Sequence, residues 1–553
     1  MINCLELRMR NREKLIMEKY GSVYTPDNLA DFASFLIFSQ IQADGSSCST
    51  VLDPACGEGS LLKSYTKINN KTSNLIGIDI DSQAIEYCQQ TFSNKYTFIN
   101  DNFLLPNTRM NDKTDSYWER KIGSVSLIFS NPPWSKDRYF NSKDLSEAGF
   151  SLKRNQYDAY VLFIELSYKI LATDGYMCFI LPDSIFDTQN DYLRKFLLEN
   201  MSVKVIARLG EKLFPNVNRA TTIILCRKTK DEANEVSCFR LETNDRKQIL
   251  NGNNTLENIY CQKSHKVKQS RFSKNNAYTF DIDTTSSDEK LISKLKKNTF
   301  VADDVFIFSR GIEISKNGLV TKCPFCGYEQ PVLKRQIGLT KICSKCGLEI
   351  KVNNSRKLIS SEKTSTNKSI FVGENLHRYI TDSEKYIELN VDDVDYKEKV
   401  FKNKKLLLIR KTGLGIYATV KENCLTTQSI YVLQPKVSDE ELYYYLGLLN
   451  SRLIYFFYIK EFGENEWKSH PYLTKTIIFS LPIKKFEPMA LNLSIAAKAK
   501  NLSEYYSADL DIELENEIFS LYNINKFERK KIISELQKLP NLSAIKQMKL
   551  LEK

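Results

Sequence analysis

Residues 124–134 read Ser-Val-Ser-Leu-Ile-Phe-Ser-Asn-Pro-Pro-Trp, and this stretch decides the fold. A short apolar run that contains β-branched and aromatic residues predicts a buried strand. Prolines cannot donate hydrogen bonds to a sheet, so the strand must end at Asn131-Pro132-Pro133-Trp134. The sequence therefore places an amide, two fixed carbonyls and an indole at the carboxyl end of a strand, where open α/β sheets bind ligands.

These four residues suit the methylation of a planar exocyclic amine. The lone pair of such an amine, for example adenine N6, is delocalised into its ring and attacks poorly. The Asn131 side-chain oxygen and the Pro132 carbonyl could accept the two amine hydrogens, and Trp134 could stack on the base. This arrangement works by orientation and local electrostatics and needs no titrating group. An ordinary strand-ending turn explains Asn-Pro alone equally well, so the neighbouring motifs decide.

Composition narrows the class of protein. A chain of 553 residues is too long for one core and suggests about three units. The net charge of +12 is a moderate sign of a polyanionic partner. The sequence contains no apolar run long enough for a membrane span, and its charged beginning lacks a signal-peptide core. We therefore expect a cytoplasmic protein with no membrane partner.

Two strand ends before residue 124 carry ligand-type residues. Residues 51–62, Val-Leu-Asp-Pro-Ala-Cys-Gly-Glu-Gly-Ser-Leu-Leu, predict a strand, a Gly-x-Gly turn and a helix. Glycines in such a turn let the backbone approach a ligand closely. Residues 75–81, Leu-Ile-Gly-Ile-Asp-Ile-Asp, predict a second strand that ends in acids, and a carboxylate there can hold ribose hydroxyls.

Two further segments extend this pattern. Residues 96–99 predict a third strand, followed by Asn-Asp-Asn-Phe, in which Asp101 could accept a hydrogen bond from an adenine amine. Thr25-Pro26 predicts the start of a helix, with Thr25 as its cap and Pro26 at its first position. Thr25 could also meet a ligand carboxylate there, because helix N-termini favour negative charge.

Taken in order, these motifs resemble those of S-adenosylmethionine-dependent DNA adenine-N6 methyltransferases. They are Tyr-Thr-Pro (24–26), Asp-Pro-Ala-Cys-Gly-Glu-Gly (53–59), Gly-Ile-Asp-Ile-Asp (77–81), Asn-Asp-Asn-Phe (100–103) and Asn-Pro-Pro-Trp (131–134). Their order resembles the gamma arrangement of type II restriction-modification enzymes. The resemblance implies an α/β fold, with a Rossmann-like, seven-stranded, mostly parallel sheet in residues 1–228.

The resemblance also implies roles for individual residues. The catalytic tetrad would be Asn131, Pro132, Pro133 and Trp134. Phe214 would stack on a flipped-out adenine opposite Trp134, since a base cannot be methylated inside the duplex. The implied contacts to S-adenosylmethionine are Thr25, Asp53, Ala55, Gly57, Gly59, Asp79, Asp101, Asn131 and Phe163.

The carboxyl-terminal half has a different character. Residues 229–295 are rich in Asn, Lys, Ser and Thr and predict a connecting region. Scattered segments of residues 296–485 resemble the α+β target-recognition domain of gamma-type methyltransferases. Residues 486–553 predict helices that brace this domain.

A cysteine cluster gives the sharpest metal signal. Cys323, Cys326, Cys343 and Cys346 have the spacing C-x2-C-x16-C-x2-C. Two such pairs can close a tetrahedral Cys4 site, so the sequence predicts a structural zinc ribbon inserted at 321–350. A redox role would need only one pair and a different fold context. The ribbon's role stays open between gripping DNA, docking a partner and local folding.

The ribbon and its tail are strongly basic. Residues 321–370 hold ten Lys or Arg residues against three Asp or Glu residues. A solvated charged face is the plain explanation, and a phosphate-facing surface is the functional one. The candidate DNA-binding residues are Lys334, Arg335, Lys341, Lys345, Lys351, Arg356 and Lys357.

We therefore expect a site-specific methyltransferase that modifies adenine N6 in double-stranded DNA within a restriction-modification or phage-defence system. One alternative is another substrate, namely cytosine N4, protein or RNA. Another is a DNA-binding subunit that needs a partner within a defence complex. We find no convincing nuclease cluster of Asp, Glu and Lys, so we expect any restriction activity to reside in a separate partner.

Overall fold

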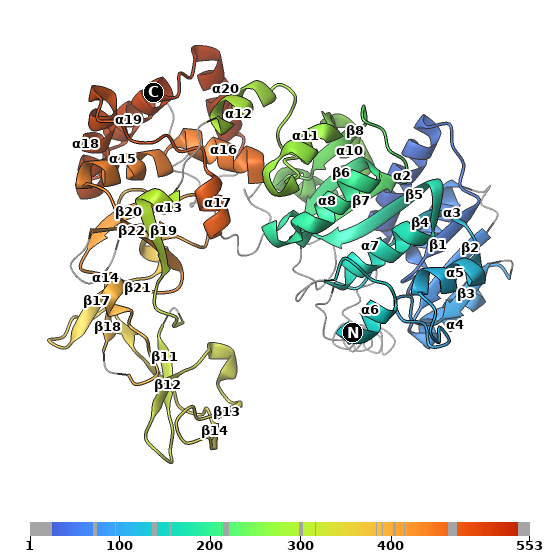
Figure 1. Cartoon of the computed structure of the whole chain (residues 1–553), viewed down its shortest axis with the longest axis horizontal. Coiled ribbons are helices and arrows are strands. Elements are labelled where there is room, and N and C mark those ends of the chain that lie inside the picture. The colour runs from blue at the N-terminus through green and yellow to red at the C-terminus, as the bar shows by residue number, and fades with distance from the viewer. Residues whose placement is uncertain are drawn as a thin grey trace. The chain divides into compact units, whose positions relative to one another are not determined.

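The computed structural model describes residues 25–539 apart from short gaps, which lie at residues 70–73, 95, 135–140, 154–157, 212, 214–219, 298–301, 316, 383, 390, 402–404, 414 and 463–472. The described residues form two compact units (Figure 1). The first contains residues 25–287 and 460–462, and the second contains residues 288–459 and 473–539. No helix in these ranges is long and apolar enough to cross a membrane.

The first unit is built on one nine-stranded sheet of order β3-β2-β1-β4-β5-β7-β6-β8-β9. Strands β1 to β5 are parallel, β7 is antiparallel to β5 and β6, and β9 is antiparallel to β8. The strands are β1 (Thr50–Asp53), β2 (Asn74–Asp79), β3 (Thr97–Asn100), β4 (Val125–Ser130), β5 (Leu171–Pro182), β6 (Ser202–Gly210), β7 (Thr221–Arg227), β8 (Glu235–Arg240) and β9 (His265–Lys268). The strand order reverses between β1 and β4, the point where α/β sheets bind ligands.

Helices cover both faces of this sheet, so its central strands are buried on both sides (Figure 1). Strand β5 shows this directly, because alternate residues from Tyr176 to Leu181 enter the two cores in turn. The helices are α2 (Asp27–Ala43), α3 (Ser60–Ile68), α4 (Ser82–Thr91), α5 (Thr114–Ile122), α6 (Ser142–Glu147), α7 (Ala159–Ile170), α8 (Asp191–Asn200), α9 (Thr243–Leu250), α10 (Leu256–Lys263) and α11 (Gln269–Lys274). Helices α2, α3, α4 and α10 contribute to one core, and α5, α7, α8 and α11 contribute to the other.

Residues 229–287 differ from the connecting region that their composition predicts. Strand β8 pairs parallel to β6, and β9 pairs with β8, so both extend the sheet to nine strands instead of seven. Within β8, residues 236–239 are all buried. Only three of these four residues are apolar, and so short a run inside a polar segment is a weak sequence signal, because periodicity cannot be judged over so few residues. The first unit consequently extends to residue 287.

The second unit contains two four-stranded sheets, of order β10-β22-β19-β20 and β16-β18-β17-β21. Their strands are β10 (Phe306–Arg310), β16 (Ile359–Ser360), β17 (Asn367–Phe371), β18 (Lys385–Glu388), β19 (Lys405–Arg410), β20 (Ala418–Glu422), β21 (Leu425–Thr426) and β22 (Ile430–Pro435). Its helices are α12 (Glu289–Lys296), α13 (Ala302–Val305), α14 (Glu398–Phe401), α15 (Asp439–Leu449), α17 (Lys475–Ser480), α18 (Ala490–Glu504), α19 (Ala508–Leu521) and α20 (Lys526–Gln537); α16 (Arg452–Phe462) ends with the residues grouped into the first unit.

The cysteine-bearing segment forms a small lobe of short strands between β10 and β16. It consists of β11 (Leu319–Lys322), β12 (Glu329–Pro331), β13 (Thr340–Ile342), β14 (Glu349–Lys351) and β15 (Arg356–Lys357). The chain enters this lobe through β11 and leaves it through β15. These two strands are antiparallel neighbours, in which Leu319 pairs with Lys357 and Val320 pairs with Arg356. We call residues 319–357 the ribbon.

Candidate active site

The predicted ligand residues follow four adjacent strands of the large sheet. Asp53 ends β1, Asp79 ends β2, Asp101 follows β3 and Asn131 follows β4. These strands are parallel neighbours in the order β3-β2-β1-β4. Their carboxyl ends therefore share one edge of the sheet, at the reversal of strand order.

The turn after β1 is held against the end of β2. The Gly57 backbone N–H donates to Asp79 Oδ2 over 2.7 Å, and Gly57 has a φ of +50°. Gly59 precedes α3 with a φ of +80°, and a Cβ there would lie 2.7 Å from the Phe92 ring. Glycine is therefore required at Gly59 by both backbone conformation and space. The Ala55 backbone N–H donates to Asp53 Oδ1 over 3.1 Å, which fixes the start of the turn.

Asp53 is the most deeply buried of the predicted ligand acids, with 1% of its surface exposed. Ser130 Oγ, on the last residue of β4, donates to Asp53 Oδ1 over 2.7 Å. The other oxygen, Oδ2, has no hydrogen-bond partner in the described part of the chain. Burial raises the pKa of Asp53 to about 7, although the hydrogen bonds from Ser130 and Ala55 oppose this shift. The sequence analysis did not predict a role for Ser130. Its only sequence signal is a hydroxyl side chain directly before Asn131.

Asp79 is half-buried and is oriented by backbone donors. Its Oδ2 accepts from Gly57, and its Oδ1 accepts from the Asp81 N–H over 2.9 Å. Burial raises the pKa of Asp79, and these backbone hydrogen bonds oppose the shift. Each carboxylate oxygen can accept more than one hydrogen bond, so the group retains capacity for a ligand hydroxyl.

Asp101 already has several partners within its own loop. Oδ1 accepts from the backbone N–H groups of Asn102 and Asn107, over 2.8 and 3.1 Å. Oδ2 accepts from the Tyr117 hydroxyl over 3.3 Å and lies 3.6 Å from Lys121 Nζ. The carboxylate thus ties the loop after β3 to α5. Neither Tyr117 nor Lys121 was predicted, because nothing in the sequence links α5 to this loop.

Thr25 and Asn131 meet, although they are far apart in sequence. Asn131 Nδ2 donates to Thr25 Oγ1 over 3.1 Å. This contact corrects the prediction that Thr25 caps α2, because the helix follows Pro26 and has no side-chain cap among the described residues. The hydroxyl serves Asn131 instead, and it orients the amide so that the side-chain oxygen faces away from Thr25.

Two of the three predicted aromatic residues, Trp134 and Phe163, are buried in the structure. Trp134 is 4% exposed and belongs to the core beneath α2 and α3, with its indole N–H 3.4 Å from the Ile180 carbonyl oxygen. A base can stack on this ring only after the ring is uncovered, so base stacking stays a prediction. Phe163, on α7, is 6% exposed, and the centre of its ring lies 5.4 Å from the centre of the Phe103 ring. Phe214 lies outside the described residues.

A buried ion pair next to this edge was not predicted. Asp183, directly after β5, accepts from Arg208 Nε of β6 over 2.6 Å and from Thr222 Oγ1 of β7 over 2.5 Å. The Arg208 guanidinium also lies 4.4 Å from the centre of the Phe186 ring. These contacts fasten the ends of three neighbouring strands. The pairing joins residues 25 positions apart, and sequence alone gives no sign of it.

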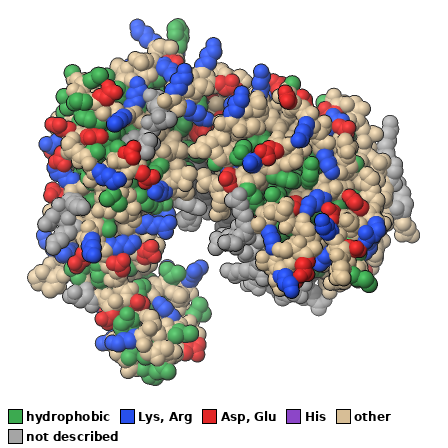
Figure 2. Space-filling view, viewed as in Figure 1, with side chains coloured by type: hydrophobic (Ala, Val, Ile, Leu, Met, Phe, Trp, Pro, Cys, Tyr) green, Lys and Arg blue, Asp and Glu red, His purple; other side chains and the backbone are tan. Residues whose placement is uncertain are grey.

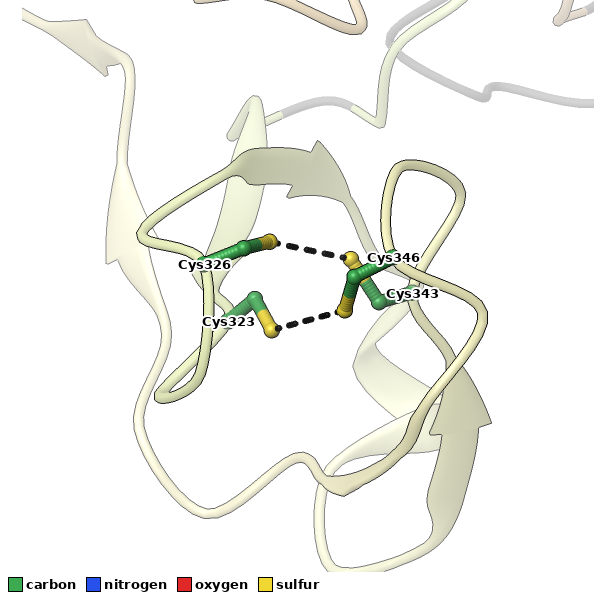
Figure 3. Close-up of side chains that lie close together, drawn as sticks. All are labelled: Cys323, Cys326, Cys343 and Cys346. Carbon is green, nitrogen blue, oxygen red and sulfur yellow. Dashed lines mark hydrogen bonds between the residues drawn. The ribbon is translucent and has the colours of Figure 1, made fainter.

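The four ribbon cysteines converge as their spacing predicts (Figure 3). All four sulfurs lie within 4.8 Å of one another, with 3.8 Å between Cys323 and Cys346 and 3.7 Å between Cys326 and Cys343. A tetrahedron with zinc–sulfur bonds of about 2.3 Å has sulfur–sulfur edges of about 3.8 Å. The cluster therefore has the size of a tetrahedral zinc site, and disulfide bonds would bring the sulfurs to about 2 Å.

The predicted DNA-binding cations of the ribbon fall into two groups. Arg356 is committed internally, since it forms a two-point pair with Glu329 and also contacts Glu388. Lys341 donates to the Pro331 carbonyl over 2.6 Å. Arg356 is exposed despite these pairs, and the other exposed members are Lys334, Arg335, Lys345, Lys351 and Lys357.

Two sequence profiles match the chain. The N-6 DNA Methylase profile matches residues 6–300, and the profile of the TaqI-like C-terminal specificity domain matches residues 368–483. The ribbon lies between these ranges and belongs to neither.

Curated relatives include two type II methyltransferases. M.VspI of Vibrio sp. (strain 343) is 30% identical over 229 residues, which cover 40% of this chain and 51% of the relative. M.BanIII of Aneurinibacillus aneurinilyticus is 31% identical over 222 residues, which cover 36% of this chain and 38% of the relative. The chain therefore spans about half or less of the length of these relatives.

Solved structures agree on the fold across most of the chain. The type IIL restriction-modification enzyme MmeI has a TM-score of 0.51 at 13% identity, covering 99% of this chain and 78% of that one. DrdV, solved with DNA, has a TM-score of 0.51 at 12% identity, covering 90% and 58%. The α/β unit with an appended carboxyl-terminal unit, predicted from the motifs, is confirmed. With its motifs at the ends of β1 to β4 and a profile match over more than half of its residues, the chain belongs to the N-6 DNA methylase family.

Proposed function

We propose that the protein transfers a methyl group from S-adenosylmethionine to N6 of a flipped-out adenine in double-stranded DNA. The observation that carries this proposal is the Asn131 amide, held by Thr25 at the end of β4 and aligned with acids at the ends of β1 to β3. Membership of the N-6 DNA methylase family supports adenine as the base.

The residues at the sheet edge fit the cofactor. S-adenosylmethionine, when bound, supplies a methyl group on a positively charged sulfur. The unsatisfied, buried Oδ2 of Asp53 suits a cationic or N–H group of its methionyl part, beside the turn of Ala55, Gly57 and Gly59. Asp79 would hold the ribose hydroxyls. Asp101 and Phe163 would lie near the cofactor adenine, with Asp101 also holding its loop.

The chain contributes orientation to the reaction. The Asn131 side-chain oxygen and the Pro132 carbonyl would accept the two hydrogens of the adenine amine and favour a tetrahedral, more nucleophilic nitrogen. The surplus proton would pass to solvent after the nitrogen–carbon bond has formed. Trp134 and Phe214 would enclose the extruded base, where stacking contributes about 1–3 kcal/mol.

The second unit would read the target sequence, which the match of residues 368–483 to a specificity domain supports. We propose that the protein acts as the modification component of a restriction-modification or defence system, in the cytoplasm. Any cleavage would then come from a separate endonuclease or complex subunit.

We propose that the ribbon cysteines hold one structural Zn²⁺ ion. The sulfur–sulfur distances support this, and four thiolate ligands leave no open position for catalysis. Metal analysis should find about one zinc per chain, and Cys343→Ser should remove it while the exposed-cysteine control Cys261→Ser retains it. A zinc-free wild-type protein from zinc-replete cells would contradict the proposal.

The test of the proposed reaction uses methyl-labelled S-adenosylmethionine and unmethylated DNA, with digestion to nucleosides and mass spectrometry. We expect labelled N6-methyladenine from the wild type and a loss of at least about a hundredfold in Asn131→Ala. Asn251→Ala, an exposed asparagine after α9, is the matched control and should retain activity. Labelled N4-methylcytosine would show that the enzyme methylates cytosine and not adenine. Cofactor binding without any labelled base would contradict the proposal that the chain alone methylates DNA.

A further inference from the structure

The ribbon carries a concentration of exposed apolar side chains. Sixteen large apolar residues are exposed in the described part of the chain, and six of them lie between residues 325 and 348. They are exposed by 40–66% and comprise Phe325, Leu333, Ile337, Leu339, Ile342 and Leu348, which we call the apolar ribbon surface. Figure 2 shows apolar side chains gathered on the lobe that contains β13 and β14. Single exposed apolar residues are ordinary, but a concentration marks an interaction site.

Local geometry brings three of these residues to the cysteine cluster. Phe325 precedes Cys326 and Ile342 precedes Cys343, and the two sulfurs lie 3.7 Å apart. The Cys343 N–H donates to the Leu348 carbonyl over 2.9 Å. The metal knuckles therefore present Phe325, Ile342 and Leu348 on the outside of one small body.

The ribbon does not need these side chains for its own core. That core consists of the buried Cys323, Cys343 and Ile350, with Val332 and Val352 also covered. Residues that stabilised the ribbon by leaving water would lie inside it. The apolar ribbon surface remains in water in the isolated chain, and a partner that covered it would gain the corresponding burial.

Positively charged residues outnumber acids within the ribbon itself, although Asp393 contacts Ser344 from outside it. Residues 321–357 contain eight Lys or Arg residues and two Asp or Glu residues. Exposed Lys334 and Arg335 lie between the apolar residues Leu333 and Ile337. Of the two acids, Glu329 is neutralised by its pair with Arg356. A complementary partner would therefore present apolar side chains flanked by carboxylates.

These features indicate that a protein, and not DNA, would cover the apolar ribbon surface. Protein interfaces combine an apolar centre with a charged rim, which matches this arrangement. Proteins insert apolar wedges into DNA at individual kinked base steps, whereas six large apolar side chains would mostly face hydrated phosphates. Two of the predicted phosphate contacts, Lys341 and Arg356, are already engaged within the ribbon.

We propose that the ribbon is a docking site for a partner protein, which binds through a segment with an apolar face flanked by Asp and Glu. The ribbon lies outside the residues matched to the methylase and specificity profiles, which supports a role separate from theirs. The proposal rests on the zinc site only for the fold of the ribbon, and it does not depend on the methyl-transfer reaction.

The experiment selects a phage-displayed library of random 16-residue peptides against the full, zinc-loaded chain. We expect enrichment of peptides that combine Leu, Ile, Phe or Trp with flanking Asp or Glu. Binding of a synthetic enriched peptide is then measured by fluorescence anisotropy. The triple variant Phe325→Ser/Ile342→Ser/Leu348→Ser should weaken it at least tenfold, whereas Leu250→Ser, 66% exposed in the first unit, should leave it unchanged.

A second variant tests the role of the positive charge beside the apolar ribbon surface. It also keeps the proposal testable if the triple variant does not fold. Lys334→Glu/Arg335→Glu should weaken the acidic peptide about tenfold and favour a peptide with Lys in place of each acid. Zinc content is measured on every sample, so that a ribbon that has lost its metal is recognised. Methyl transfer is assayed in parallel, and peptide binding without methyl transfer would contradict only the proposed function.

Three results would overturn the docking proposal. The first is a selection that enriches no acidic-apolar peptide, or enriches it equally with the zinc-loaded triple variant. The second is a triple variant that weakens salt-sensitive DNA binding tenfold, which would make the ribbon a DNA-contacting surface. The third is a wild-type dimer in sedimentation that the triple variant converts to a monomer, since the occupant would then be a second copy of the chain.

Discussion

At the scale of single residues, the buried carboxyl of Asp53 lowers the stability of the fold at neutral pH. Its carboxyl is buried with a pKa of about 7, so the folded chain holds a proton that the unfolded chain releases near pH 4. The contribution to stability is therefore complete at low pH and declines as the pH rises through 7.

We expect Asp53→Asn to remove this decline. Relative to the wild type, the variant should gain on the order of 2–3 kcal/mol of unfolding free energy between pH 5 and pH 8. Urea unfolding of the cofactor-free proteins at the two pH values measures this difference. Parallel pH dependences for wild type and variant would show that Asp53 does not titrate in this range.

Thr25 offers a test of what holds Asn131. If the Thr25 hydroxyl orients the amide, Thr25→Val should lower kcat roughly tenfold with little change in the dissociation constant of S-adenosylmethionine. Thr25→Ser retains the hydroxyl and serves as the control. Weaker binding of S-adenosylmethionine with an unchanged kcat would instead indicate that Thr25 contacts the methionine carboxylate.

At the scale of elements, the carboxyl-terminal helices are fastened by buried charge. Asp511 of α19 accepts from Arg378 over 2.7 and 2.8 Å and from Arg452 of α16 over 3.0 Å, and all three are at most 2% exposed. Burial alone would raise the pKa of Asp511, but the two guanidinium groups hold it below its usual value. Helix α19 is thereby anchored to the body of the second unit.

We expect Asp511→Ala to destabilise the second unit by about 3–5 kcal/mol, because it leaves two buried cations without their shared anion. Asp509→Ala, an exposed acid in the same first turn of α19, should change stability by less than about 0.5 kcal/mol. Chemical denaturation with a probe in the second unit gives both values. Equal effects of the two substitutions would contradict an anchoring role.

The ribbon strands should depend on the proposed zinc ion. Each strand has at most four residues, and the apolar core they enclose is small, so the strands have little else to hold them together. Chelation of zinc should raise amide hydrogen exchange across residues 319–357 at least tenfold and leave β5 unchanged. Unchanged protection of the ribbon after verified metal loss would contradict metal-dependent folding.

At the scale of the whole molecule, the sequence predicted the ends of the first strands better than it predicted the limits of the units. The ends of β1 to β4 were predictable because glycines, acids and prolines interrupt short apolar runs there. Strands β8 and β9 were not, because the surrounding sequence is polar and each strand is short. The partnerships Thr25–Asn131, Ser130–Asp53 and Asp183–Arg208 depend on strand order, which one sequence does not specify.

The two strands that join the ribbon to the second unit have a consequence for how such proteins diversify. Because β11 and β15 lie side by side, the intervening residues can be exchanged for a segment of another length without altering the register of the flanking strands. The ribbon is in this sense an interchangeable cassette. A lineage could acquire, lose or replace it while the strands on either side kept their pairing.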